Sequence, residues 1–131
     1  MRYVRYQYKG FTECGVLLEN DTIQQVEKLP YKGMRSQEIT KTKSLSLSDV
    51  ELVSPCEPRK IIATAINFPG ATGLTNGMDE PLIFIKPSSS VIGQNQTICS
   101  PFEDTSVWGE PELALVIGKT LSRATTEEAG Q

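Results

Sequence analysis

Two carboxylates separated by a single proline are the first residues in this sequence that could do chemistry. Glu110 and Glu112 flank Pro111, directly before the apolar run 113–117. In an extended chain these two side chains point to the same side, about 6–7 Å apart along the strand. Such a pair can hold a hard divalent cation such as Mg²⁺ or Mn²⁺ together with further oxygen ligands. From the spacing alone, two solvated carboxylates at a strand entry are the more ordinary interpretation.

A lysine and a run of serines follow another apolar segment. Lys86 comes directly after residues 82–85 and precedes Pro87 and three serines, of which Ser89 is the middle one. An ammonium group at the end of a buried strand can bind a carboxylate or an enolate oxygen, and the hydroxyls add hydrogen-bond donors. The competing interpretation is a lysine that extends into solvent beside a serine-rich turn, and composition alone favours it.

A side-chain amide follows the preceding apolar run in the same way. Asn67 comes directly after residues 61–66. Its amide could orient a substrate, or it could simply close a local turn of the backbone. The sequence leaves both interpretations of Asn67 open.

The composition narrows the possible chemistry further. The 131 residues include no histidine, which excludes an imidazole base and the common zinc sites that use histidine. Cys14, Cys56 and Cys99 are widely spaced, so we expect free thiols and a cytoplasmic location. The net charge of −3 argues against a nucleic-acid partner. No apolar run approaches the roughly 20 residues of a membrane span, so no membrane partner is expected.

Alternating apolar residues predict a small antiparallel sheet at the start of the chain. The segments 2–8, 13–18 and 22–26 each alternate with a period of two, and Lys9-Gly10 is a turn signal between the first two. A polar connector follows this sheet. We therefore predict a small N-terminal β domain with its connector over residues 1–55.

A second domain is predicted over residues 56–131, because the prolines around Cys56 interrupt any strand ladder. Three apolar runs follow, at 61–66, 82–85 and 113–117, and each is bounded by glycine, proline or asparagine. This pattern fits strands that are buried on both faces, although runs this short do not exclude helix.

The last residues have the pattern of a helix start. Thr125 can cap the helix, and Glu128 three residues later completes a capping box. A helix of one turn is not stable alone. We therefore expect Gln131 to be followed by further residues in a longer protein.

Taken in order, four segments resemble the fumarylacetoacetate hydrolase family. The first resembles the family's K-I-I-x-x-x-x-N-[YF] segment, the second its P-x-x-F-x-K-P-x-[ST]-[SA]-x-x-G segment, and the third its E-x-E-L-[AG]-x-V-[IM]-G-[KR] metal segment. The fourth lies where the family's [ST]-x-E-E-A helix begins. They are residues 59–68, 81–93, 110–119 and 125–129.

The resemblance implies a mainly β fold with few helices, a β-rich α+β mixed sheet that this chain would leave incomplete at its C-terminus. Members of the family are usually homodimers that act on small 2-oxo acids through a metal-stabilised enolate, by tautomerisation, decarboxylation or C–C hydrolysis. The metal is Mg²⁺, Mn²⁺ or Ca²⁺. By this resemblance Glu110 and Glu112 would be metal ligands, and Lys86 would contact the substrate's carboxylate or enolate oxygen.

Two departures from the family pattern limit these expectations. Hydrolytic members carry a His and a Glu shortly after the Asn, where this sequence has Ala71 and Leu74. The family's third metal ligand, an Asp, lies beyond Gln131. We therefore expect the isolated chain to be inactive and the complete protein to be a hydrolase, isomerase or decarboxylase. The alternative is a non-catalytic, degenerate paralogue or one chain of a hetero-oligomer.

Overall fold

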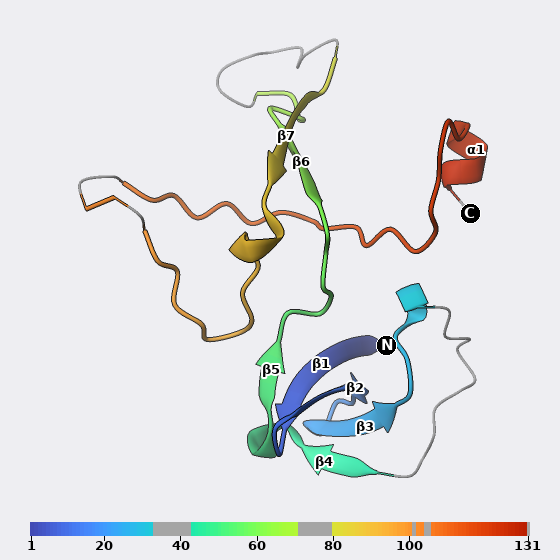
Figure 1. Cartoon of the computed structure of the whole chain (residues 1–131), viewed down its shortest axis with the longest axis vertical. Helices are drawn as coiled ribbons and strands as arrows, with labels where there is room; N and C mark the ends of the chain where they lie inside the picture. Colours follow the sequence, from blue (N-terminus) through green and yellow to red (C-terminus); the bar gives the residue numbers. More distant parts are fainter. Residues whose placement is uncertain (33–42, 71–79, 101, 104–105, 131) are drawn as a thin grey trace.

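The computed structural model describes residues 1–32, 43–70, 80–100, 102–103 and 106–130. These residues form two antiparallel sheets and a short helix, which confirms the predicted β-rich fold (Figure 1). The strands are β1 (Arg2–Tyr8), β2 (Phe11–Leu17), β3 (Thr22–Val26), β4 (Ser44–Ser46), β5 (Glu51–Val53), β6 (Ile61–Ala65) and β7 (Leu82–Lys86), and the helix is α1 (Thr126–Ala129).

The N-terminal sheet has the strand order β4-β3-β2-β1-β5, and every pairing in it is antiparallel. Its first hairpin closes at the pair Tyr8↔Phe11, which leaves only Lys9 and Gly10 in the turn. Both turn residues have positive φ, 48° and 84°, as the tight hairpin turn that matches strand twist requires. The three strands predicted from alternation are confirmed.

The core of this sheet is small. Tyr6, Val16, Ile23, Val26 and Leu29 are its buried apolar side chains among the described residues. Burial, and next the charge of the neighbouring Glu13, raise the pKa of the Tyr6 hydroxyl, so this buried phenol stays neutral.

A glycine allows β2 and β3 to pack this closely. A Cβ on Gly15 would lie 2.4 Å from the Cγ2 atom of Ile23, 2.9 Å from the backbone oxygen of Gln24 and 3.3 Å from the Tyr6 ring. No side chain fits in that space without moving the neighbouring strand. Gly15 is therefore a packing requirement of the core.

β6 and β7 form a separate two-stranded hairpin, paired from Ile61↔Lys86 to Ala65↔Leu82. The prediction that these strands are buried on both faces is wrong. Every residue of β7 is exposed, and β6 alternates between half-buried and exposed residues. A two-stranded hairpin covers neither of its own faces, and no other described strand pairs with it.

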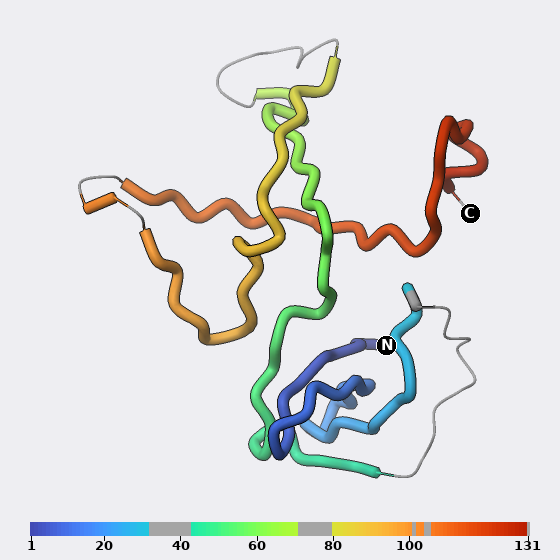
Figure 2. Tube along the Cα trace, in the orientation of Figure 1, coloured from blue at the N-terminus to red at the C-terminus, as the bar shows by residue number. Residues whose placement is uncertain are grey.

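The third apolar run is not a strand in the structure. Within the described part of the chain, residues 106–121 form neither helix nor strand, and the trace in Figure 2 runs through them as an open, extended chain. Leu113, Leu115 and Ile117 are 92%, 81% and 75% exposed. The prediction of a buried strand over 113–117 is therefore wrong, because an apolar run becomes a strand only when it pairs with the edge of another strand.

The total accessible surface of the chain is also larger than that of a compact protein. The accessible surface of the chain is 11238 Å². A compact monomer of the same mass exposes roughly 6,800 Å². The exposed apolar side chains of β6, β7 and residues 106–121 contribute to this excess of accessible surface.

The predicted capping box at the start of α1 is confirmed. The Thr125 hydroxyl accepts a hydrogen bond from the Glu128 amide at 3.2 Å, and the Glu128 carboxylate accepts one from the Thr125 amide at 2.8 Å. These bonds satisfy amide groups that would otherwise lack partners at the helix start.

Candidate active site

Lys86 is the last residue of β7, at the end of the hairpin where β6 begins. Its side chain is exposed, and its Nζ atom lies 5.9 Å from the centre of the Phe84 ring two residues earlier. This distance allows a weak cation–π contact, which favours one side of the strand for the ammonium group. Lys86 is therefore a charged, solvent-accessible hydrogen-bond donor, and its role in substrate binding stays a prediction.

The serine-rich segment after Lys86 is a compact turn. A 3-10 helical turn spans Ser88–Ser90, and both the amide and the hydroxyl of Ser90 donate to the Pro87 carbonyl, at 3.0 and 2.7 Å. The Val91 amide donates to the Ser88 carbonyl at 3.3 Å. Pro87 favours this geometry because its ring restricts φ, here −66°. The turn presents Ser89 as an exposed residue close to Lys86 along the chain.

Asn67 lies at the opposite end of the same hairpin. The antiparallel register pairs Lys86 with the first residue of β6, whereas Asn67 lies two residues beyond the last, so a ladder about 13 Å long lies between the two residues. The Asn67 amide donates to the Thr64 hydroxyl at 3.0 Å, across a turn in which Ile66 has a φ of 51°. Asn67 closes a local turn here, and its substrate-orienting role stays a prediction.

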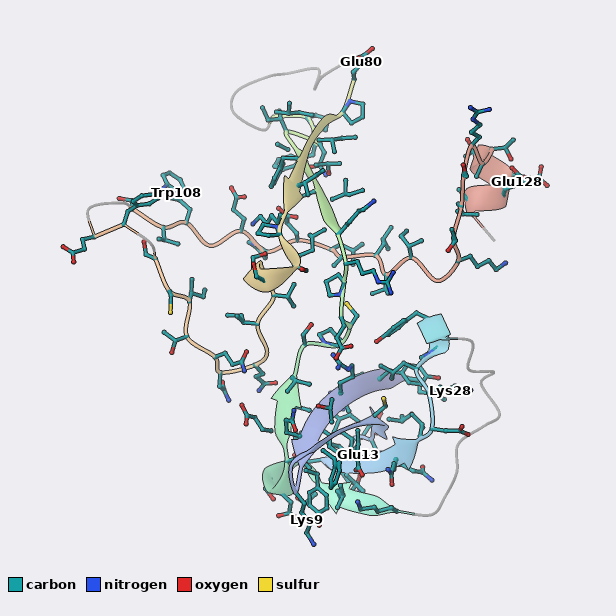
Figure 3. The ribbon with its side chains drawn as sticks, in the orientation of Figure 1. Lys9, Glu13, Lys28, Glu80, Trp108 and Glu128 are labelled. Carbon is teal, nitrogen blue, oxygen red and sulfur yellow. The ribbon has the colours of Figure 1, made fainter. Side chains whose placement is uncertain are left out.

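Glu110 and Glu112 lie on the exposed segment 106–121. In Figure 3 the labelled Trp108 and Glu128 mark opposite ends of the stretch that contains both carboxylates. The donors fit a hard cation in type, since carboxylate oxygens are what Mg²⁺ and Mn²⁺ prefer. They do not complete a site, because the described ranges contain no cluster of three or more His, Cys, Asp or Glu side chains suited to a metal.

Sequence reasoning assigned no role to Arg5, which the structure buries to 8% exposure beside the connection between the two sheets. Its guanidinium donates to the Ser54 carbonyl at 2.9 Å and forms an ion pair with Glu57. Arg5 alternates with the apolar residues of β1, and this alternation gave no indication that its side chain is buried. The burial of Arg5 is seen only in the tertiary structure, where the linker residues Ser54 and Glu57 contact its guanidinium.

Tyr31 holds the same linker from another side. Its hydroxyl donates to the Pro55 carbonyl at 3.2 Å. Burial is the main reason that the pKa of Tyr31 is raised, so this phenol remains a hydrogen-bond donor at neutral pH. The linker after β5 is thus held by the side chains of Arg5 on β1 and Tyr31 after β3.

A pocket of about 400 Å³ lies between the N-terminal sheet and the segment that follows β7. Arg5, Gln7 and Thr12 line it from the sheet, and Ser88 and Gly93 line it from the segment. The side-chain amide of Gln7 donates a hydrogen bond to the Thr12 hydroxyl at 2.7 Å. The serine-rich turn therefore lies across this pocket from the polar side chains of Arg5, Gln7 and Thr12.

Among the described residues, no helix is long and apolar enough to span a membrane. Cys14, Cys56 and Cys99 are all free of disulfides, as the sequence predicted.

The chain belongs to the fumarylacetoacetate hydrolase family. The model of the fumarylacetoacetate hydrolase C-terminal domain matches residues 60–131, and the Rv2993c-like N-terminal model matches residues 1–55. The resemblance inferred from the four sequence segments is therefore confirmed.

Individual relatives support the same assignment. The chain is 32% identical over 89 residues to Protein Rv2993c of Mycobacterium tuberculosis, covering 66% of this chain and 34% of that protein. It is 38% identical over 88 residues to the mitochondrial oxaloacetate tautomerase fahd2 of Xenopus laevis, covering 65% of this chain and 28% of that protein. The chain thus spans about a third of the length of these curated relatives.

A solved structure shares the fold. The 5-carboxymethyl-2-hydroxymuconate delta-isomerase of Mycobacterium smegmatis superposes with a TM-score of 0.54 at 22% identity, covering 70% of this chain and 35% of that one. At this identity the likeness concerns the fold alone.

Proposed function

We propose that the complete protein is a divalent-metal-dependent enzyme of the fumarylacetoacetate hydrolase family that acts on a small 2-oxo acid. The observation that carries this proposal is the family match over residues 60–131, a range that includes Lys86 and both carboxylates. A relative named as an oxaloacetate tautomerase suggests a keto–enol substrate. The activity is proposed for the whole protein, because the chain spans only about a third of the length of its curated relatives.

In this proposal Glu110 and Glu112 would hold the cation, which is Mg²⁺ or Mn²⁺, with Ca²⁺ as a further candidate. The ion would supply positive charge that stabilises an enolate oxygen. Lys86 would bind the substrate's carboxylate or enolate oxygen through its ammonium group. Ser89 would donate a hydrogen bond to the same substrate, and Asn67 would orient it.

Tautomerisation or decarboxylation fits these residues better than hydrolysis. Ala71 and Leu74 stand where hydrolytic members carry the His and Glu that activate water, and neither side chain can accept a proton. Both positions lie outside the described residues. We propose that the complete protein is a homodimer in the cytoplasm, in keeping with three cysteines that form no disulfide.

A second candidate is a non-catalytic paralogue, or one chain of a hetero-oligomer that supplies the missing ligands. One observation favours this candidate. Among the described residues, Glu110 and Glu112 belong to no group of three or more acidic, cysteine or histidine side chains that could hold a metal ion, so the metal site is incomplete. This candidate predicts no turnover by the complete protein on its own.

The test uses the complete protein with Mg²⁺ or Mn²⁺ and measures oxaloacetate tautomerisation, oxaloacetate decarboxylation and acylpyruvate hydrolysis side by side. We expect Glu112→Ala to weaken metal binding and activity by about a hundredfold or more, because a ligand charge is lost. Lys86→Ala should lower turnover by about a hundredfold while metal binding survives. Glu19→Ala and Lys28→Ala are matched controls at other exposed positions.

Two outcomes would contradict the proposal. An inactive complete protein favours the non-catalytic candidate. Acylpyruvate hydrolysis faster than either oxaloacetate reaction would show that a base elsewhere in the protein replaces the missing dyad.

A further inference from the structure

Gly93, in the segment after β7, packs tightly against the backbone of the N-terminal sheet. A Cβ at this position would lie 2.9 Å from the Val53 Cα atom and 3.0 Å from the Leu52 backbone oxygen. Both of those atoms belong to the backbone of β5, which cannot yield as a flexible side chain would. The backbone of Gly93 is not in the left-handed region, so glycine is needed here for space and not for conformation.

This contact closes a ring in the chain. β5 leads through the linker into β6, β6 pairs with β7, and the segment after β7 returns to β5 at Gly93. Figure 1 shows β6 continuing from the end of β5. The linker is itself held, because Arg5 donates to Ser54 and pairs with Glu57 while Tyr31 donates to Pro55. Both ends of the ring are therefore attached to the N-terminal domain.

Local hydrogen bonds stiffen the ring between β7 and Gly93. Ser90 and Val91 donate to carbonyls three residues earlier in the turn. The Gly93 amide donates to the side-chain oxygen of Gln96 at 2.7 Å, which closes a second turn around Asn95. These bonds restrain residues 87–91 before Gly93 and residues 93–96 after it, so we expect a displacement at Gly93 to reach the segment that carries Lys86 and Ser89.

We propose that Gly93 is a positioning residue: by packing against the backbone of β5, it fixes the Lys86–Ser90 segment relative to the N-terminal domain. The N-terminal domain then acts as a platform for substrate binding. This catalytic meaning rests on the proposed function, whereas the mechanical role can be tested without it.

The first experiment measures backbone amide hydrogen exchange by NMR in this chain. Gly93→Ala should speed exchange at Ser90 and Val91 by about tenfold, while the β1–β2 amides keep their wild-type rates. Gly109→Ala is the matched control, because a Cβ at Gly109 has no atom within 4 Å, and it should leave all these rates unchanged. Unchanged exchange at Ser90 and Val91 in Gly93→Ala, or equal acceleration of the β1–β2 amides, would overturn the inference.

The second experiment uses the complete protein. Gly93→Ala should raise the KM for oxaloacetate by about fivefold or more while Mg²⁺ affinity stays at the wild-type value, because Lys86 is displaced and the carboxylates are not. A general loss of folding would lower kcat and Mg²⁺ affinity together, and that result would count against a positioning role. If the wild-type protein lacks activity but Gly93→Ala still loosens the turn selectively, the proposed function fails and the positioning contact stands.

Discussion

The two partners of the ion pair between Arg5 and Glu57 differ strongly in solvent exposure. A double-mutant cycle should measure how much this pair contributes to stability. The Arg5 side chain is 10% exposed, whereas the Glu57 side chain is 70% exposed. Arg5→Met keeps most of the aliphatic stem that covers the sheet but removes the charge and the bond to Ser54. Glu57→Gln keeps the shape of its side chain and removes only the charge.

The magnitudes follow from this asymmetry. Arg5→Met should lower the free energy of unfolding by about 2–3 kcal/mol, because a charged hydrogen bond is lost and the Ser54 carbonyl loses its partner. Breaking a fully buried pair costs about 3–5 kcal/mol and an exposed pair under about 1 kcal/mol. Since one partner is buried and the other exposed, Glu57→Gln should cost about 1–2 kcal/mol. The double variant should cost no more than Arg5→Met alone, which gives a coupling of about 1–2 kcal/mol.

The assay is urea unfolding followed by far-UV circular dichroism, repeated at low and high salt. Most of the coupling should survive 1 M salt, because ions screen a buried guanidinium poorly. Glu51→Gln is the matched control, an exposed carboxylate on β5 outside this cluster. A coupling below about 0.3 kcal/mol, or a Glu57→Gln cost equal to that of Glu51→Gln, would refute the argument that the linker is held by a buried charge.

Two further predictions concern the core and the helix cap. Gly15→Ala should lower the free energy of unfolding by about 1–3 kcal/mol or more, because its Cβ would overlap Ile23 and the β3 backbone; urea unfolding against Gly109→Ala checks this, and equal stabilities would contradict it. Hydrogen bonds from the Thr125 amide, and next its hydroxyl, lower the pKa of Glu128 from 4.5, so the cap's contribution to helix stability is present above pH 4.5 and is lost as pH falls through the lowered pKa. An NMR titration should find this lowered pKa, and Thr125→Ala should move it back toward 4.5; a wild-type value at or above 4.5 would contradict the cap.

Local patterns in the sequence were enough to predict the elements that form from neighbouring residues. Alternation together with the Lys9-Gly10 turn predicted the first hairpin, because a tight turn and a period of two leave only one register open. The capping box at Thr125 was predictable for the same reason, since its partners are three residues apart. The order of four short segments was also sufficient to indicate the family.

The tertiary structure decided everything that depends on distant partners. Apolar runs predicted the strands β6 and β7, but not how they pair. Their antiparallel pairing puts Lys86 and Asn67 at opposite ends of the hairpin. The alternation in β1 gave no indication that Arg5 is buried, because its burial depends on a linker some fifty residues away, at Ser54 and Glu57. Periodicity records which side of a strand a residue occupies, whereas burial and pairing depend on which other segment lies against that side.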